Sequence, residues 1–379
     1  MKDHSLEVHG CHTYDATGAI SPSICLSATF RHPRFGESMG YDYGRVANPT
    51  RESLEKTVAL LERGGRSWAL SSGMAAVQLV FSLLSAGDHV LMSEDLYGGT
   101  VRLAEEVFAG YGITFEYVDV RDLALVGKRM RPETKLVFIE TPSNPMMQIS
   151  DIAALAALAH ENGALLAVDN TFLSPHFQKP LTLGADIVLH SGTKYLCGHN
   201  DVIAGFLVLK DATSAQAKRI ELLAKSAGPN LSALDSWLML RSIKTLGVRV
   251  ERQAENALAI AQWLGTLPEV TEVLYPGLAD HPGYALQQKQ ASGAGGMISF
   301  KVRSAEIAKA ALGRLHLIAF AESLGGVETL LTYPIAQTHA EMPAALLKRT
   351  GLDDKLLRLS VGIEDVEDLK ADLQQALQG

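Results

Sequence analysis

The chain has 379 residues, of which 47% are apolar and 20% charged, and its net charge is −8. This length is sufficient for two or three domains with a large core, while the acidic balance argues against nucleic acid or an anionic membrane as a partner, because both favour basic patches. No apolar run approaches the ~18 residues of a membrane span, and the N-terminus has no signal-peptide core. We therefore expect a cytoplasmic protein that binds neither nucleic acid nor a membrane.

Residues 1–45 lack sustained periodicity and contain Gly, Pro and several aromatic residues, which indicates an extended arm that must pack on something. Within it, His9, Cys11 and His12 lie close together, but their spacing fits no standard metal site. We expect them to be loop residues and expect no bound metal. Three cysteines are also too few and too scattered for a disulfide framework.

A helix is predicted from Glu52 to Arg63, because Leu54, Val58 and Leu61 recur at helical spacing, and Thr50 is placed to cap it. From Trp68 onward, short apolar runs alternate with helical patterns such as 74–84 and 152–160. This alternation predicts a mostly parallel, doubly wound sheet in a large α/β domain, residues 46–245, with its ligand at the carboxyl ends of the strands. The predicted strands are Trp68–Ser71, His89–Met92, Thr114–Val118, Lys135–Glu140, Ala164–Asp169, Ala185–His190 and Ile203–Leu209.

Long helices follow, predicted at 233–245 and 249–264 and separated by Leu246-Gly247. We expect residues 246–379 to form a smaller α+β domain. Its predicted strands lie at Thr271–Leu274, Met297–Val302 and Leu356–Val361, and its final helix at Val366–Leu377.

Lys194 follows the predicted strand 185–190 and is flanked by the hydroxyls of Ser191 and Thr193. Enzymes of the α/β class place their chemistry at such strand ends. Most lysines are simply solvated, but a lysine at this place can also hold pyridoxal 5′-phosphate (PLP) covalently. The residues alone leave both readings open.

Three other features suit a PLP site, and each has a plainer explanation. Gly73 and Met74 open a helix after a strand, so their amides form a phosphate site or belong to an ordinary turn. Asp169 ends a strand, where it can keep a pyridine nitrogen protonated or head a turn. Tyr97 follows another strand end, where its ring can stack on a cofactor or pack in a loop.

Taken together, these features resemble the PLP-dependent enzymes of cysteine and methionine metabolism, from about His9 to the C-terminus. The resemblance implies an aspartate aminotransferase-like PLP-dependent transferase of fold type I, with a mostly parallel seven-stranded sheet, and a homotetramer made of two catalytic dimers. The motifs that carry it are Tyr41-x-Tyr43-x-Arg45 with Asn48-Pro-Thr50-Arg51, Ser72-Gly-Met-Ala75, Asp95-x-Tyr97-Gly-Gly-Thr100, Glu140-Thr-Pro-Ser-Asn144-Pro, Val168-Asp-Asn-Thr171, Thr193-Lys-Tyr195 with Gly198-His199, and Glu322-Ser-Leu-Gly-Gly326.

The same resemblance implies a role for each matching position. Lys194 would carry PLP and shuttle protons, Asp169 would pair with the pyridinium, and Tyr97 would stack on the ring. A planar arginine fork suits the α-carboxylate of the amino-acid substrate. The phosphate would be held by Gly73, Met74, Ser191 and Thr193, and by Tyr43 and Arg45 of the neighbouring subunit; the substrate carboxylate by Asn144 and Arg358, with Ser323 and Thr338 beside it.

Glu322 bears on the choice of reaction, because relatives that handle cystathionine or cysteine tend to have an acid there, whereas methionine γ-lyases tend to be apolar. Arg102 could help to hold a distal carboxylate; either charge could instead be a solvated rim residue. Segments 235–241 and 322–334 are most similar to bacterial cystathionine γ-synthase/O-acetylhomoserine thiolyase sequences. We therefore rank γ-replacement on an O-acylhomoserine first and a cystathionine β- or γ-lyase second, ahead of an aminotransferase or a non-catalytic metabolite-binding protein.

Overall fold

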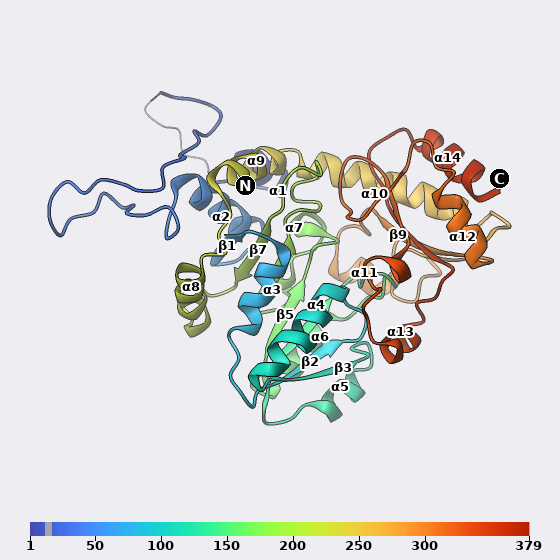
Figure 1. Ribbon diagram of the computed structural model, residues 1–379, viewed down its shortest axis with the longest axis horizontal. Coiled ribbons are helices and arrows are strands. Elements are labelled where there is room, and N and C mark those ends of the chain that lie inside the picture. Colours follow the sequence, from blue (N-terminus) through green and yellow to red (C-terminus); the bar gives the residue numbers. More distant parts are fainter. Residues whose placement is uncertain (12–16, 379) are drawn as a thin grey trace.

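The computed structural model describes residues 1–11 and 17–378, and it contains two β-sheets joined by a long helix (Figure 1). Within these residues the first sheet has seven strands in the order β1-β7-β6-β5-β4-β2-β3. This confirms the predicted α/β class and the seven-stranded sheet. The strands are β1 (Arg66–Leu70), β2 (His89–Ser93), β3 (Thr114–Val118), β4 (Thr134–Glu140), β5 (Leu165–Asp169), β6 (Ile187–Ser191) and β7 (Gly205–Leu209).

The sheet is mostly parallel, as predicted. Strands β6, β5, β4, β2 and β3 run parallel to one another, and β7 runs antiparallel to both of its neighbours, β1 and β6. The central parallel strands are apolar because helices cover both faces of the sheet, whereas β3 at its edge is only partly buried. Each of these strands lies within a few residues of its predicted range, since a short buried apolar run marks a strand clearly.

Two apolar cores flank this sheet. One contains Leu54 and Leu155 and lies beneath α2 and α6, while the other contains Val80 and Ile220 and lies beneath α3 and α8. Because β4, β5 and β6 are neighbouring parallel strands, their carboxyl ends lie at the same end of the sheet. The helices of this part are α2 (Pro49–Leu61), α3 (Gly73–Phe81), α4 (Gly98–Leu103), α5 (Leu123–Arg129), α6 (Ile152–Glu161), α7 (Ser174–Phe177), α8 (Ala215–Ala227) and α9 (Ala233–Ile243).

The second sheet has the order β10-β11-β12-β9-β8 in the described part of the chain and is mostly antiparallel. It packs with α10, α12 and α14 around its own apolar core, which includes Ile260, Phe300 and Leu373. This confirms a smaller α+β unit, although the residue boundaries between units stay a prediction. Its elements are α10 (Leu246–Leu264), β8 (Val270–Leu274), α11 (Tyr284–Gln290), β9 (Met297–Val302), α12 (Ala305–Leu312), β10 (Ala319–Phe320), β11 (Leu330–Thr332), α13 (Ala344–Thr350), β12 (Leu356–Ser360) and α14 (Val366–Gln378).

The N-terminal arm differs from its prediction in one respect. Its first residues form a helix, α1 (Asp3–His9), held down by the buried Leu6, so His9 is helical rather than a loop residue. Cys11 lies in a turn after this helix, and His12 is outside the described residues. Beyond residue 17 the arm extends away from the body of the molecule, drawn in blue in Figure 1.

Two helix boundaries were also predicted wrongly. Asn48, not Thr50, caps α2, because its side chain accepts hydrogen bonds from the amides of Thr50 and Arg51 and Pro49 occupies the first turn. Leu246-Gly247 does not separate two helices either. It forms the first turn of α10, and the break falls between Ile243 and Leu246.

Candidate active site

A cavity of about 280 Å³ opens at the carboxyl ends of β4, β5 and β6, where the sequence predicted the ligand. Its walls come from the N-terminus of α3, from the turn after β6 and from the second sheet. The structure therefore brings together residues that lie almost 300 positions apart in the chain. The predicted site residues that line the cavity are Gly73, Met74, Tyr97, Asn144, Asp169, Ser191, Thr193, Lys194, Glu322, Ser323, Thr338 and Arg358.

Lys194 lies in the turn that follows β6, and its amino group points into this cavity. Thr193 fixes the turn, because its hydroxyl oxygen accepts from the amide of Ala204 at 3.0 Å. Nζ of Lys194 donates to Oγ of Ser323 at 2.7 Å. Burial and, to a smaller extent, the nearby charge of Arg358 lower the pKa of Lys194 to about 8, although Glu322 acts in the opposite direction. An amine with this pKa is partly neutral near pH 7, so it can act as a nucleophile or a base.

Asp169 ends β5 and lies next to Glu140, which ends β4 in the same register. Oδ1 of Asp169 accepts from the amide of Thr171 at 3.0 Å and from its hydroxyl at 2.5 Å. Burial raises the pKa of both carboxyl groups, and that of Glu140 lies well above its ordinary value because the neighbouring charge of Asp169 raises it further. Two adjacent buried carboxyl groups favour a cationic partner at this point.

Glu140, which belongs to one of the sequence motifs, is a site residue for which the sequence predicted no role. Its carboxylate accepts the amide of Tyr97 at 3.0 Å and thereby positions the loop that carries this ring. The signal was available, because Glu140 ends an apolar strand as Asp169 does. Thr171, which orients Asp169, was missed in the same way.

The N-terminus of α3 forms a small concave surface against the end of β6. Ser72 caps this helix by accepting from the amide of Ala75 at 3.1 Å. A Cβ at Gly73 would lie 2.9 Å from Cβ of Ser191, so only glycine permits this approach. The first amides of a helix have no partner inside it and attract anions. Hydroxyls of Ser191 and Thr193 lie on the same cavity wall, which suits a phosphate group.

Arg358 of β12 is 2% exposed and closes the cavity from the second sheet. Its guanidinium donates to Oδ1 of Asn144 at 2.7 Å, and its Nε has no hydrogen-bond partner among the described residues. Burial lowers the pKa of Arg358 to about 10, so it stays charged at neutral pH. A buried charged fork with donors to spare suits a carboxylate ligand.

Three predicted site residues do not line the cavity. Arg102 is exposed and pairs with Glu341. Tyr43 and Arg45 lie in the arm and line a separate hollow with Gly228, and Arg45 donates to the carbonyl of Lys225. Their expected action from a neighbouring subunit stays a proposal.

The residues of the cavity fit the phosphate, the ring nitrogen and the aldehyde of PLP. The α3 amides suit the phosphate, the paired carboxyl groups suit a protonated ring nitrogen, and Lys194 suits the aldehyde carbon. Arg358 remains for the substrate. The fold and the site thus define a PLP-dependent enzyme of fold type I.

The chain belongs to the family of Cys/Met metabolism PLP-dependent enzymes, whose model matches residues 4–378. It is 47% identical over 379 residues to a cystathionine γ-lyase of Bacillus subtilis, covering 100% of both chains. It is 46% identical to a cystathionine γ-synthase/O-acetylhomoserine (thiol)-lyase of the same species, covering 96% of this chain and 92% of the relative.

A solved structure also supports membership of this family. The crystal structure of cystathionine γ-synthase from Xanthomonas oryzae pv. oryzae in complex with aminoacrylate and cysteine has a TM-score of 0.96 and 41% identity, covering 100% of this chain and 98% of that one. The protein is therefore a PLP-dependent member of the cystathionine synthase and lyase group.

Proposed function

We propose that the enzyme catalyses γ-replacement on an O-acylhomoserine, with cysteine or sulfide as the nucleophile, to give cystathionine or homocysteine. The observation that carries this proposal is the position of Glu322, whose side chain lines the cavity beside Ser323 and Lys194. A carboxylate at this place can bind the ammonium group of a second amino acid, which cysteine and cystathionine have.

The ranking of synthase over lyase rests on the resemblance of segments 235–241 and 322–334 to bacterial synthase and thiolyase sequences, and the relative named a cystathionine γ-synthase/O-acetylhomoserine (thiol)-lyase supports it. A cystathionine β- or γ-lyase is the second candidate, because Glu322 would meet the distal amine of cystathionine equally well. The relative named a cystathionine γ-lyase supports this second candidate.

In the proposed mechanism, Arg358 and Asn144 hold the substrate α-carboxylate and thereby fix Cα near Nζ of Lys194. The neutral amine of Lys194 takes the proton from Cα and returns it later, while the hydroxyl of Ser323 accepts a hydrogen bond from this amine. Bound PLP supplies an electron sink for the charge left on Cα. Asp169 would stabilise a positive charge on the ring nitrogen of bound PLP, and Tyr97 would stack on its ring.

The test is a comparison of products. Purified enzyme is incubated with O-acetyl- or O-succinylhomoserine plus cysteine, and separately with cystathionine alone. We expect cystathionine from the first mixture and slow keto-acid release from the second, and no turnover of either by Lys194→Ala. Rapid release of pyruvate or of 2-oxobutyrate from cystathionine, without γ-replacement, would overturn the synthase and favour a β-lyase or a γ-lyase, respectively.

We also propose that the enzyme is a cytoplasmic homotetramer built from two catalytic dimers. No helix in the described residues is long and apolar enough to cross a membrane. The arm has large exposed apolar side chains, among them Leu26, Phe35 and Met39. Such side chains favour contact with another surface, and a neighbouring subunit would cover them.

A further inference from the structure

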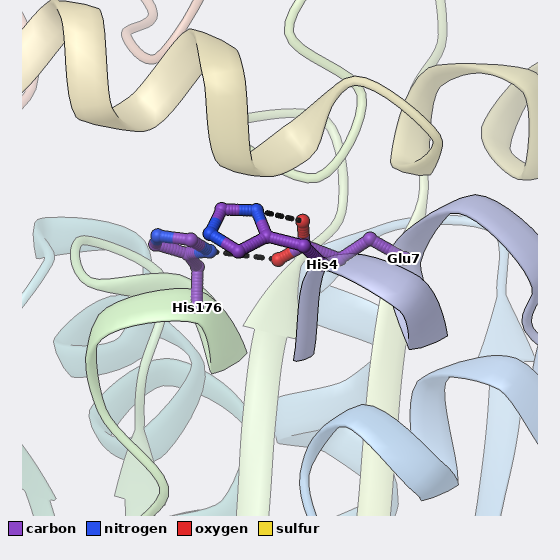
Figure 2. Close-up of side chains that lie close together, drawn as sticks. All are labelled: His4, Glu7 and His176. Carbon is purple, nitrogen blue, oxygen red and sulfur yellow. Dashed lines mark hydrogen bonds and ion pairs between the residues drawn. The ribbon is translucent and has the colours of Figure 1, made fainter. Parts of the chain in front are cut away.

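His4, Glu7 and His176 form a cluster of residue types that commonly bind metals, where α1 meets α7 and α10. None of these three residues lines the cavity at Lys194. His4 and Glu7 come from α1, and His176 comes from α7. Figure 2 shows both imidazole rings beside the Glu7 carboxylate. Nδ1 of His176 is 2.7 Å from Oε1 of Glu7, and Nδ1 of His4 is 3.6 Å from its Oε2.

These three side chains are suitable ligands for a borderline divalent cation such as Zn²⁺. One donor atom from each lies within 4.8 Å of the other two. Donor atoms around a tetrahedral zinc ion are about 3.3 Å apart, so only small movements are needed to close the site. The side chain of His4 is 61% exposed and is free to make them, whereas Glu7 and His176 are held in place by burial.

A second carboxylate lies on the other side of both rings. Oε1 of Glu251, on α10, is 3.4 Å from Nε2 of His4 and 3.4 Å from Nε2 of His176. Each ring therefore directs Nδ1 toward Glu7 and Nε2 toward Glu251. A carboxylate behind a ligating imidazole keeps the proton on the far nitrogen and leaves the lone pair of the near one for the metal.

The start of α10 leaves room for this arrangement. The amide of Gly247 donates to Oε2 of Glu7 at 3.1 Å, so Oε1 is the oxygen that faces His176. A Cβ at position 247 would lie 2.6 Å from Oε2 of Glu7 and 2.7 Å from Nδ1 of His4. A side chain at position 247 would therefore displace the ends of Glu7 and His4 from their places in the cluster.

We propose that His4, Glu7 and His176 bind a divalent cation of the zinc class, with Glu251 orienting the two imidazoles, and that the ion fastens α1 to α7 and α10. Binding replaces the hydrogen bond between His176 and Glu7 and releases to solvent any proton held on the two Nδ1 atoms. Without an ion, the same side chains form an ion-pair network that docks α1. With a bound ion the stability of the protein should depend on the metal concentration, whereas without a metal site it should not.

The test uses untagged, PLP-loaded enzyme that has been treated with EDTA and then titrated with Zn²⁺, with metal content and melting temperature as readouts. His4→Ala removes an exposed ligand, and His9→Ala, on the same helix but outside the cluster, is the matched control. We expect one zinc per chain in the native and His9→Ala proteins, and at least ~10-fold weaker binding in His4→Ala. Zinc should raise the melting temperature of the first two proteins only.

His176→Gln checks the buried ligand and should also lose zinc, even where its own melting temperature falls. Native protein that binds no zinc tighter than about 1 mM would leave the cluster as an ion-pair network and overturn the proposal. Equal zinc binding by native protein and His4→Ala would assign the ion to another place and overturn it too.

Discussion

Nζ of Lys194 and Oγ of Ser323 are 2.7 Å apart, so the reactive amine after β6 is hydrogen-bonded to a residue of the C-terminal unit. Ser323 has a φ of +98°, a conformation that non-glycine residues rarely adopt. Backbone strain of this kind persists where the surroundings impose it and is common at active sites. The two parts of the chain are thus joined at the group that does the chemistry.

The lowered pKa of Lys194 predicts how apoenzyme reacquires its cofactor. Attachment needs the neutral amine, and with a pKa of about 8 about a tenth of the enzyme has it at pH 7, rising to half at pH 8. At the ordinary pKa the neutral fraction at pH 7 would be below ~0.1%. The rate of PLP attachment to apoenzyme should therefore increase with pH, with its midpoint near pH 8, and level off about one pH unit higher, which stopped-flow absorbance can measure.

Substitution of the charged residue beside Lys194, with a distant glutamate as the control, tests this prediction. Since Glu322 raises the pKa of Lys194, Glu322→Gln should move the midpoint of the rate profile to lower pH. Glu341→Gln, an exposed glutamate outside the cavity lining, should leave it unchanged. A profile that still rises beyond pH 10 would contradict the lowered pKa.

Arg358 provides a second prediction. Arg358→Lys keeps the positive charge but loses the planar fork that can bind a carboxylate with two parallel hydrogen bonds. We expect kcat/KM for any amino-acid substrate to fall about 100-fold or more, with PLP absorbance retained. Unchanged kcat/KM, with only a lower melting temperature, would show that Arg358 serves the fold through Asn144 and not the substrate.

Most strands of the large sheet could be predicted from sequence because they are short apolar runs, buried on both faces, between polar turns; the edge strand β3 is only partly buried. Helix α1 could not, since seven residues do not form a stable helix alone and this one depends on packing against α2 and α10. The cap at Asn48 was available, because Pro49 at the first helical position indicates a cap one residue earlier.

Some residues of the candidate site could likewise be predicted from local sequence, and others could not. Asp169 and Lys194 follow apolar strands, and position at a strand end is visible in the sequence. The bond between Arg358 and Asn144 joins residues 214 positions apart and comes from the packing of the two sheets, which no local pattern describes. Only the family resemblance indicated it.

Glu322 gives the third prediction, which concerns the second substrate. Glu322→Gln removes the charge that would pair with a distal ammonium group, and an exposed pair of this kind contributes about 1 kcal/mol. KM for cysteine or cystathionine should increase about fivefold, whereas sulfide, which has no amine, should be affected much less. Equal losses with cysteine and sulfide would indicate that Glu322 acts on Lys194 or on the fold.

The last prediction concerns the arm, whose Tyr43 and Arg45 lie outside the cavity that contains Lys194. If Arg45 acts on the neighbouring subunit's phosphate, each active site combines Lys194 of one chain with Arg45 of another. Lys194→Ala and Arg45→Ala should each be inactive or severely impaired alone. When the two are unfolded, mixed equally and refolded, half of the catalytic dimers contain one chain of each kind, and one of their two sites is intact. Activity should then recover to about a quarter of the native value, because the assembly is symmetric.

The same mixture made with Lys194→Ala and Asp169→Ala is the control. Both substitutions then affect the side of a site that contains Lys194, so no site regains both groups. Failure of the first mixture to exceed the second would place Arg45 with its own chain and contradict the shared site.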